Sequence, residues 1–285
     1  MQIKSWFDKD TSTLTYCVYD ETTKDAILID SVWDYDPASG SLRMTSVHQV
    51  ADFIRSEDLI LHFILETHAH ADHITGAQPL KILFPSAKVA MGQRITEVQK
   101  VFKGVFNFGD HFAVDGRQFD LLLADGSETK AGSLTIKTLF TPGHTPACVS
   151  YLIGDALFTG DALFMPDSGT GRCDFPAGSA ESLFESIQKL YRLPDSTRVF
   201  TGHDYQPNGR PLKFESTIGE QKSSNIQIKA STAKTDYVTF RNSRDKTLSA
   251  PRLLLPSIQV NADGGHLPAP ESNGSRYLKM PIKER

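Results

Sequence analysis

Four of the six consecutive positions 68–73 carry side chains that bind metal ions: His68, His70, Asp72 and His73. Imidazole and carboxylate groups suit Zn²⁺ and Fe²⁺, and alternating residues in an extended turn can converge on one ion. A polar loop with surface histidines is the alternative interpretation. However, three of the nine histidines in the chain fall within this hexapeptide, beside an acidic residue. We therefore predict that this segment holds a metal ion.

Three further candidate ligands, His144, Asp161 and His203, share one context along the chain. Each directly follows a glycine, and each comes shortly after a segment that we expect to be a strand. A single histidine or aspartate at such a turn is usually only solvated. The repetition favours a different interpretation, because polar residues at the ends of neighbouring buried strands gather at one edge of a sheet. We therefore predict that these three side chains join the 68–73 site.

Short segments rich in β-branched and aromatic residues predict the strands that would position these side chains. The expected strands are Thr13–Tyr19, Ala26–Asp30, Leu59–Leu65, Leu134–Phe140, Cys148–Ile153, Ala156–Thr159 and Arg198–Thr201. The run at 59–65 is almost continuously apolar, as expected of a strand buried on both faces, and it leads into the 68–73 segment. Helical spacing of apolar residues predicts one helix from Val47 and another after Ser179, which is suited to cap it.

The composition is that of an ordinary globular protein, and it excludes several classes of function. The 285 residues are 39% hydrophobic and 22% charged, which is enough for a sizeable core. With a net charge of −4 and no basic run, we expect no nucleic-acid partner. No stretch approaches the roughly 20 apolar residues of a membrane span, so we expect no membrane association.

Cysteine usage and the N-terminal residues indicate the compartment. The three cysteines, Cys17, Cys148 and Cys173, lie far apart without metal-binding or redox spacing, which favours a reducing environment. We expect them to be packing residues rather than persulfide carriers. The first ten residues are typical of neither a secretory signal nor a transit peptide. We therefore expect a cytoplasmic protein.

From about Pro207 onward the sequence becomes more polar, with prolines at 207, 211, 251, 256, 268, 270 and 281. This shift in composition predicts two parts. Residues 1–206 would form the catalytic core, and residues 207–285 a C-terminal extension packed on the core.

The order of the candidate ligands resembles that of the metallo-β-lactamase superfamily. There an H-x-H-x-D-H motif, a later histidine, a Gly-Asp aspartate and a final histidine line a site between two sheets. The resemblance covers roughly residues 10–206 and implies an α/β fold, the αββα sandwich, with a site for one or two metal ions. It does not choose the reaction, since this fold hosts hydrolases, oxidoreductases and nucleases.

Several strings resemble one branch of that superfamily, the persulfide dioxygenases (sulfur dioxygenases), including their bacterial β-lactamase-like members. The strings are Thr67–Gly76, Thr141–Cys148, Phe158–Leu163, Gly171–Phe175 and Gly202–Tyr205, with Arg241–Asp245 and Leu255–Asn261 in the extension. This family oxidises glutathione persulfide with O₂ to sulfite and glutathione, in the detoxification of sulfide and persulfides. It uses one Fe(II) per chain, held by two histidines and one aspartate. Carried over, the resemblance implies His68, His144 and Asp161 as the ligands and catalytic centre.

That ligand set also makes chemical sense, because a 2-His-1-carboxylate triad leaves positions on Fe(II) for a persulfide sulfur and for O₂. In the related glyoxalase II thioesterases, a second metal is held at the positions of His70, Asp72, His73 and His203. A dinuclear zinc thioesterase, a hydroxyacylglutathione hydrolase, therefore remains the alternative. In the iron interpretation the same four residues orient the ligands and hydrogen-bond water or substrate. A non-catalytic binding module would be expected to have lost ligands, and none is lost here.

The resemblance also implies residues that bind glutathione, whose two carboxylates favour a guanidinium and a phenol. Arg172 and Tyr205 match the neighbourhood that meets glutathione in both families, although Arg172 could instead pair with Asp174. Arg241 and Arg244 are weaker candidates, because both could lie on a solvated helix face. The expected partners are the small-molecule substrate and O₂. The sequence does not decide the assembly, and a homodimer stays open.

Overall fold

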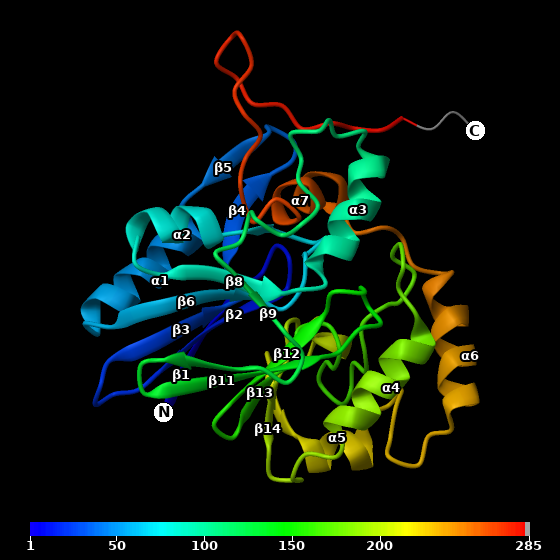
Figure 1. The fold of residues 1–285 in the computed structure, drawn as a ribbon. Helices are drawn as coiled ribbons and strands as arrows, with labels where there is room; N and C mark the ends of the chain where they lie inside the picture. Colours follow the sequence, from blue (N-terminus) through cyan, green and yellow to red (C-terminus); the bar gives the residue numbers. More distant parts are fainter. Residues whose placement is uncertain (283–285) are drawn as a thin grey trace.

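Two six-stranded sheets lie face to face in the computed structural model, which describes residues 1–282 (Figure 1). The first sheet has the order β1-β2-β3-β6-β8-β9, with strands Gln2–Asp8, Thr13–Tyr19, Asp25–Ile29, Ile60–Glu66, Lys88–Gly92 and Leu121–Leu123. The second runs β10-β11-β12-β13-β14-β15, with strands Glu128–Ala131, Leu134–Phe140, Val149–Ile153, Ala156–Phe158, Arg198–Phe200 and Glu215–Thr217. A small sheet has the order β5-β4-β7, with strands Ser41–Arg43, Val32–Asp36 and Ile74–Thr75.

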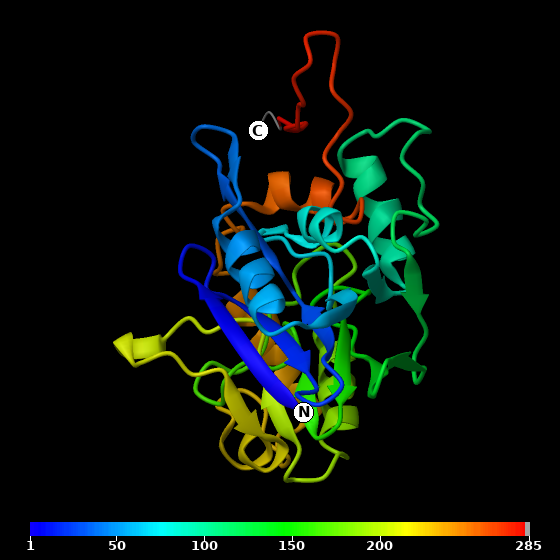
Figure 2. The same ribbon diagram turned by 90° about the vertical axis from the view of Figure 1, so that its left-hand side faces the viewer.

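Helices cover the outer face of each large sheet, as Figures 1 and 2 show. The helices over the first sheet are α1 (Thr45–Ser56), α2 (Ala77–Leu83) and α3 (Ile95–Val105). Those over the second are α4 (Ala180–Leu190) and α5 (Ile218–Ser224). Further along the chain come a short 3-10 turn, η1 (Pro207–Gly209), and the helices α6 (Lys234–Asp245) and α7 (Leu254–Asn261). Helix α6 packs on α4, and α7 packs on β7.

Alternation along the central strands explains why the core has three layers. In β2, the side chains of Leu14, Tyr16 and Val18 pack between the sheets, whereas Cys17 packs toward the helices. Because successive side chains of a strand point to opposite faces, a strand that is apolar at nearly every position needs cover on both. A third apolar cluster fills the space between the second sheet and α4. The predicted αββα sandwich is confirmed.

The predicted strands agree with the observed ones to within one residue at either end. The helix expected from Val47 begins at Thr45, and Ser179 caps α4 as predicted, because its hydroxyl accepts a hydrogen bond from the Ser182 amide. The remaining strands are not among the predicted ones: β1, β4, β5, β7, β8, β9, β10 and β15. The longest of them is β1. This strand lies at the edge of the first sheet and is only half-buried, so its pattern is weak.

The extension continues the sandwich as well as packing on it. Strand β15 lies beyond residue 206, yet it pairs with β14 as the edge of the second sheet. The second sheet thus includes residues on both sides of position 206, and the division of the chain into a core and an extension at that position remains a prediction. After α7 the chain projects as an irregular arm (Figures 1 and 2).

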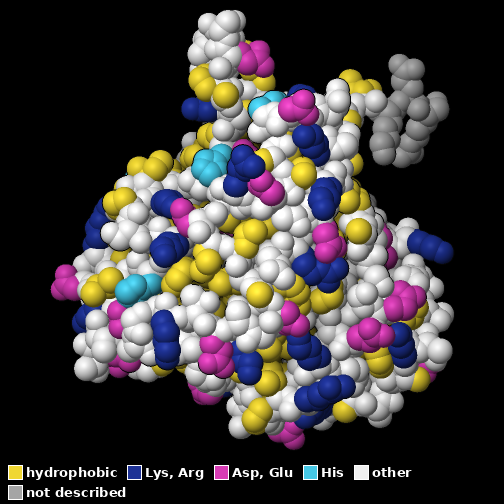
Figure 3. All heavy atoms as spheres, viewed as in Figure 1, with side chains coloured by type: hydrophobic (Ala, Val, Ile, Leu, Met, Phe, Trp, Pro, Cys, Tyr) yellow, Lys and Arg dark blue, Asp and Glu magenta, His cyan; other side chains and the backbone are white. Residues whose placement is uncertain are grey.

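Figure 3 shows basic and acidic side chains interspersed over the face that it presents. In the part of the chain that the structure describes, no helix combines the length and the apolar character needed to cross a membrane.

Candidate metal centre

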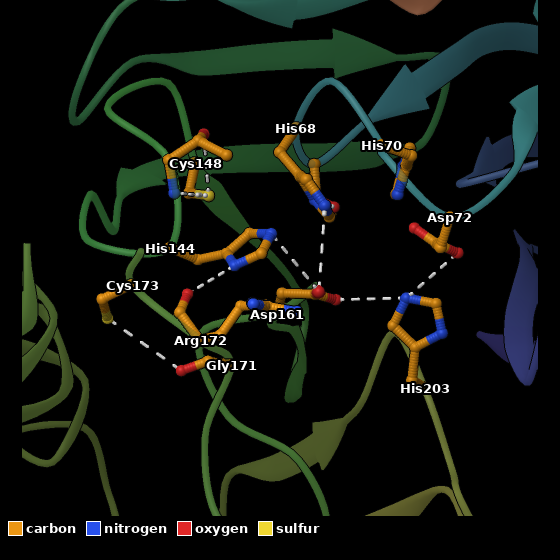
Figure 4. Close-up of polar contacts among 12 residues, drawn as sticks. His68, His70, Asp72, His144, Cys148, Asp161, Gly171, Arg172, Cys173 and His203 are labelled. Carbon is orange, nitrogen blue, oxygen red and sulfur yellow. Dashed lines mark hydrogen bonds and ion pairs between the residues drawn. The ribbon is translucent and has the colours of Figure 1, made fainter. Parts of the chain in front are cut away.

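Loops that follow four strands meet at one edge of the sandwich, and they bring the candidate ligands together (Figure 4). The loop after β6 carries the 68–73 motif, while the loops after β11, β13 and β14 carry His144, Asp161 and His203. All of the candidate histidines and Asp161 are buried, and Asp72 is half-buried.

The glycines that precede His144 and Asp161 have a structural reason. Gly160 has φ +49°, which side chains rarely adopt, and a Cβ there would collide with the side chain of Thr67. Gly143 has φ +147°, and a Cβ there would press against the backbone of Leu183 in α4. Only glycine lets the ligand-bearing loops approach their neighbours this closely, which explains the repeated glycine–ligand pattern in the sequence.

The Asp161 carboxylate lies at the centre of three imidazoles. Its Oδ2 is 3.9 Å from His68 Nε2 and 3.5 Å from His144 Nε2, and its Oδ1 is 3.4 Å from His203 Nε2. Two ligands about 2.1 Å from one ion are ~3–3.5 Å apart when they subtend roughly 90–110° at that ion. The spacing is therefore close to that of side chains that share a metal ion.

Two groups of potential ligands overlap at this centre. His68, His144 and Asp161 form one group, whose ligand atoms all lie within 4.8 Å of one another. His68, His70 and Asp72 form a second group by the same measure. His203 bridges the two, because its Nε2 is also 3.5 Å from Asp72 Oδ2. The geometry thus accommodates a single triad or a pair of adjacent sites.

The outward-facing ring nitrogens of the histidines are held by the protein. His144 Nδ1 donates to the carbonyl oxygen of Arg172 at 2.6 Å, and His203 Nδ1 donates to that of Ser12 at 3.1 Å. A carbonyl can only accept, so both rings carry their proton on Nδ1 and leave the Nε2 lone pair free for a metal. His68 Nδ1 lies 3.0 Å from the Thr67 hydroxyl, and its Nε2 is likewise free for a metal.

The inward-facing atoms fit a bound metal ion. Four buried atoms of this cluster have no hydrogen-bond partner among residues 1–282: His68 Nε2, His70 Nδ1, His73 Nε2 and Asp161 Oδ1. Buried polar atoms are rarely left unpaired. Burial and the neighbouring imidazoles of His70 and His144 also lower the pKa of His68 well below its usual range, which favours the neutral form that binds metals.

His70 is anchored by two carboxylates to which the sequence analysis gives no role. Its Nε2 lies 3.0 Å from Asp30 Oδ1 and 3.2 Å from Glu66 Oε2. Although burial opposes the charge, these carboxylates raise the pKa of the His70 imidazole well above its usual range. Asp30 also accepts hydrogen bonds from the Thr67 amide and hydroxyl, at 2.7 and 2.8 Å. The sequence feature that could have identified Asp30 and Glu66 as site residues is their position at the ends of buried strands.

His73 lies beside the second group without belonging to it. Its Nδ1 is 2.9 Å from Asp72 Oδ2 and 3.3 Å from the Thr13 hydroxyl. Although burial opposes ionisation, the imidazoles of His203 and His73 lower the pKa of Asp72 well below its usual range.

A cavity of about 490 Å³ opens onto the metal centre. Asp72, His144 and Asp161 line it on the side of the centre. The rest of its wall includes polar residues, among them Asp10 and Gln227, together with aromatic side chains and four arginines: Phe164, Phe175, Tyr205, Arg172, Arg241, Arg244 and Arg252. An anionic substrate with an apolar part would match such a wall.

The predicted substrate residues all line this cavity, but they differ in how fully they are engaged. Arg172 forms a bidentate pair with Asp174, at 2.6 and 2.7 Å, and donates to the carbonyl of Ser249 at 2.7 Å. Tyr205 is 56% exposed and stacks on the ring of His203. The substrate role that the resemblance implies for each remains a prediction.

The two arginines of the extension that were predicted to bind substrate lie in contrasting environments. A solvated helix face is wrong for Arg241, which is 2% exposed, pairs with Asp245 at 2.5 Å and donates to Gln227 at 3.0 Å. Arg244 is exposed, as is Arg252, which the sequence analysis does not single out. Neither of these two makes an ion pair with any residue in 1–282, and both line the cavity.

All three cysteines are free and buried. Burial raises the pKa of the Cys148 thiol to about 12 and also raises that of Cys173. Both side chains therefore stay protonated at neutral pH, as expected of packing residues.

Curated relatives resemble this chain over nearly its whole length. A "Probable metallo-hydrolase" of Burkholderia pseudomallei is 45% identical over 99% of both chains. "Glyoxylase B2" of Dictyostelium discoideum is 45% identical over 99% of this chain and 97% of its own. A "Beta-lactamase hydrolase-like protein" of Xylella fastidiosa is 46% identical over 99% of this chain, which spans only 64% of that longer relative.

Relatives named ETHE1 are more distant. The mitochondrial persulfide dioxygenase ETHE1 of Mus musculus is 30% identical over 79% of this chain and 75% of its own. The crystal structure of ETHE1 from Myxococcus xanthus is 31% identical, with a TM-score of 0.74 over 93% of this chain and 100% of that chain. The sequence profile described as "Metallo-beta-lactamase superfamily" matches residues 10–203, the segment that contains every candidate ligand. With this match and the αββα architecture, the chain belongs to the metallo-β-lactamase superfamily.

Proposed function

We propose that this chain is an iron-dependent persulfide dioxygenase, which oxidises glutathione persulfide with O₂ to sulfite and glutathione. The balanced reaction takes one persulfide, one O₂ and one water, cleaves the S–S bond, and transfers four electrons from sulfur to O₂. The products are glutathione and sulfurous acid, which ionises to sulfite. The similarity to ETHE1 supports this assignment over most of the chain.

The observation that carries the proposal is the triad of His68, His144 and Asp161 at the cavity. The two Nε2 atoms and one carboxylate gather around one point, and the protein holds Nδ1 of His144 through the Arg172 carbonyl. Two neutral imidazoles and one carboxylate suit Fe(II), which would supply the O₂ chemistry and leave coordination positions for substrate. The set contains no thiolate, the ligand that favours structural zinc.

The wall of the cavity supports an anionic thiol substrate. Arg244 and Arg252 are unpaired within residues 1–282 and lie on the wall, where they can bind the two carboxylates of glutathione. Phe164 and Phe175 give the wall near the metal centre an apolar surface, which excludes water from the persulfide. The three free cysteines fit a reducing compartment, the cytoplasm, in which glutathione is abundant.

A zinc thioesterase of the glyoxalase II type is the second candidate, and a specific arrangement favours it. Asp72 belongs to the second group of ligands, and His203 Nε2 is nearly equidistant from the carboxylates of Asp72 and Asp161. The relatives that match over the whole chain include "Glyoxylase B2" and a "Probable metallo-hydrolase". With a second metal ion bound there, the same residues would support hydrolysis.

Elemental analysis of protein purified without added metal separates the two candidates. The proposal predicts about one iron per chain and little zinc. A content of about two zinc ions per chain would contradict the iron assignment and favour the thioesterase. Expression in medium supplied with both metals in equal amounts controls for simple availability.

A further inference from the structure

One side chain of the extension binds the loop that carries the first ligands. The amide nitrogen of Asn261, at the end of α7, donates to the carbonyl oxygens of His70 at 2.8 Å and His73 at 2.7 Å. Its amide oxygen accepts from the Thr75 backbone N–H at 2.9 Å. The side chain is 4% exposed, and every hydrogen-bonding group except one acceptor lone pair is used.

The loop has few other restraints of this kind. Within residues 1–282, the backbone N–H and C=O groups of residues 68–73 make no backbone–backbone hydrogen bond. The start of the loop is held by Asp30, which accepts from the Thr67 amide, and its far end is held by Asn261. Asn261 therefore takes the place that a neighbouring strand or helix would normally fill for a buried backbone segment.

The contact also depends on where α7 lies. The helix packs on β7, the strand that directly follows the loop, and Ile258 anchors it in the apolar cluster beneath the first sheet. Asn261 thus reaches the loop from a rigid element. An asparagine suits the position because it offers two donors and an acceptor at once; aspartate lacks the donors, and glutamine is one methylene longer.

We propose that Asn261 is a positioning residue of the metal centre. By fixing the backbone at His70 and His73, it holds the ligand loop in the conformation that binds metal, although its side chain meets no ligand atom. Metal affinity would then depend on the extension as well as on the core. Asn261 would have the same role in a dioxygenase and in a thioesterase, because the loop carries His68, a candidate ligand in both groups.

The test compares Asn261→Leu with Gln259→Leu. Gln259 lies in the same helix and is equally buried, but its amide bonds to Leu255 and Lys279 rather than to the loop. Co(II) serves as the probe: its Kd is measured by competition with a chromogenic chelator, and its visible spectrum reports the ligand geometry. Thermal unfolding of the metal-free proteins checks that each variant folds.

Asn261→Leu should weaken Co(II) binding by roughly 10- to 100-fold, the usual effect of losing a group that orients metal ligands, and should alter the spectrum. Gln259→Leu should leave both unchanged. A folded Asn261→Leu protein with the wild-type Kd and spectrum would overturn the proposal, as would an equal loss in Gln259→Leu. If Asn261→Leu does not fold, Asn261→Ala decides by the same criteria, because the smaller side chain leaves room for water beside the freed carbonyls.

Discussion

The metal centre and the wall of the cavity above it are built in different ways. The candidate ligands come from loops that follow core strands, and each imidazole or carboxylate is buried or half-buried and held by neighbours. Much of the cationic wall comes from the extension, where Arg244 and Arg252 are exposed and unpaired within residues 1–282. A buried, preorganised centre suits the chemistry, whereas an exposed wall can vary with the substrate. The two parts should therefore respond differently to substitution.

The largest effect should come from the middle of the buried centre. Asp161→Ala removes the one carboxylate of the triad and should weaken metal binding by about 100-fold or more, because two neutral imidazoles alone make a poor site. Metal content after dialysis and a competition Kd measure this loss. His203→Ala is the matched control and should retain one equivalent of metal, since His203 lies outside the triad. Full metal retention in Asp161→Ala, or complete loss in His203→Ala, would show that the ligand set is different.

The same contrast explains how much could be predicted from the sequence. Metal ligands are recognisable because few residue types bind metals and because glycines such as Gly160 must precede them at close approaches. Strands in the middle of the sheets were predictable where two-sided burial leaves a nearly continuous apolar run, as at 59–65, whereas short or half-buried strands such as β1 were not. Asn261 was not predictable as a functional residue, since its partners are backbone groups 186–191 positions away. Nor was the burial of Arg241, which depends on packing between α6 and a core loop.

A smaller effect should come from the wall. The double variant Arg244→Ala/Arg252→Ala should raise KM for an anionic glutathione substrate roughly 10-fold, with little change in kcat, because exposed ion pairs contribute about 0.2–1 kcal/mol each. Arg172→Ala should raise KM less and lower Tm more, since its guanidinium already pairs with Asp174. Steady-state kinetics and thermal unfolding of both proteins measure the difference. A larger KM effect in Arg172→Ala would assign the carboxylate contact to Arg172 instead.

The choice between two glutathione substrates distinguishes persulfide dioxygenation from thioester hydrolysis. Protein loaded anaerobically with Fe(II) is placed in an oxygen electrode and given either glutathione persulfide or S-lactoylglutathione. We expect persulfide-dependent O₂ uptake with about one sulfite formed per O₂ consumed, and little hydrolysis of the thioester. Asp161→Ala protein serves as the blank for uncatalysed persulfide oxidation. Rapid hydrolysis of S-lactoylglutathione without persulfide-dependent O₂ uptake would contradict the dioxygenase assignment and favour the thioesterase.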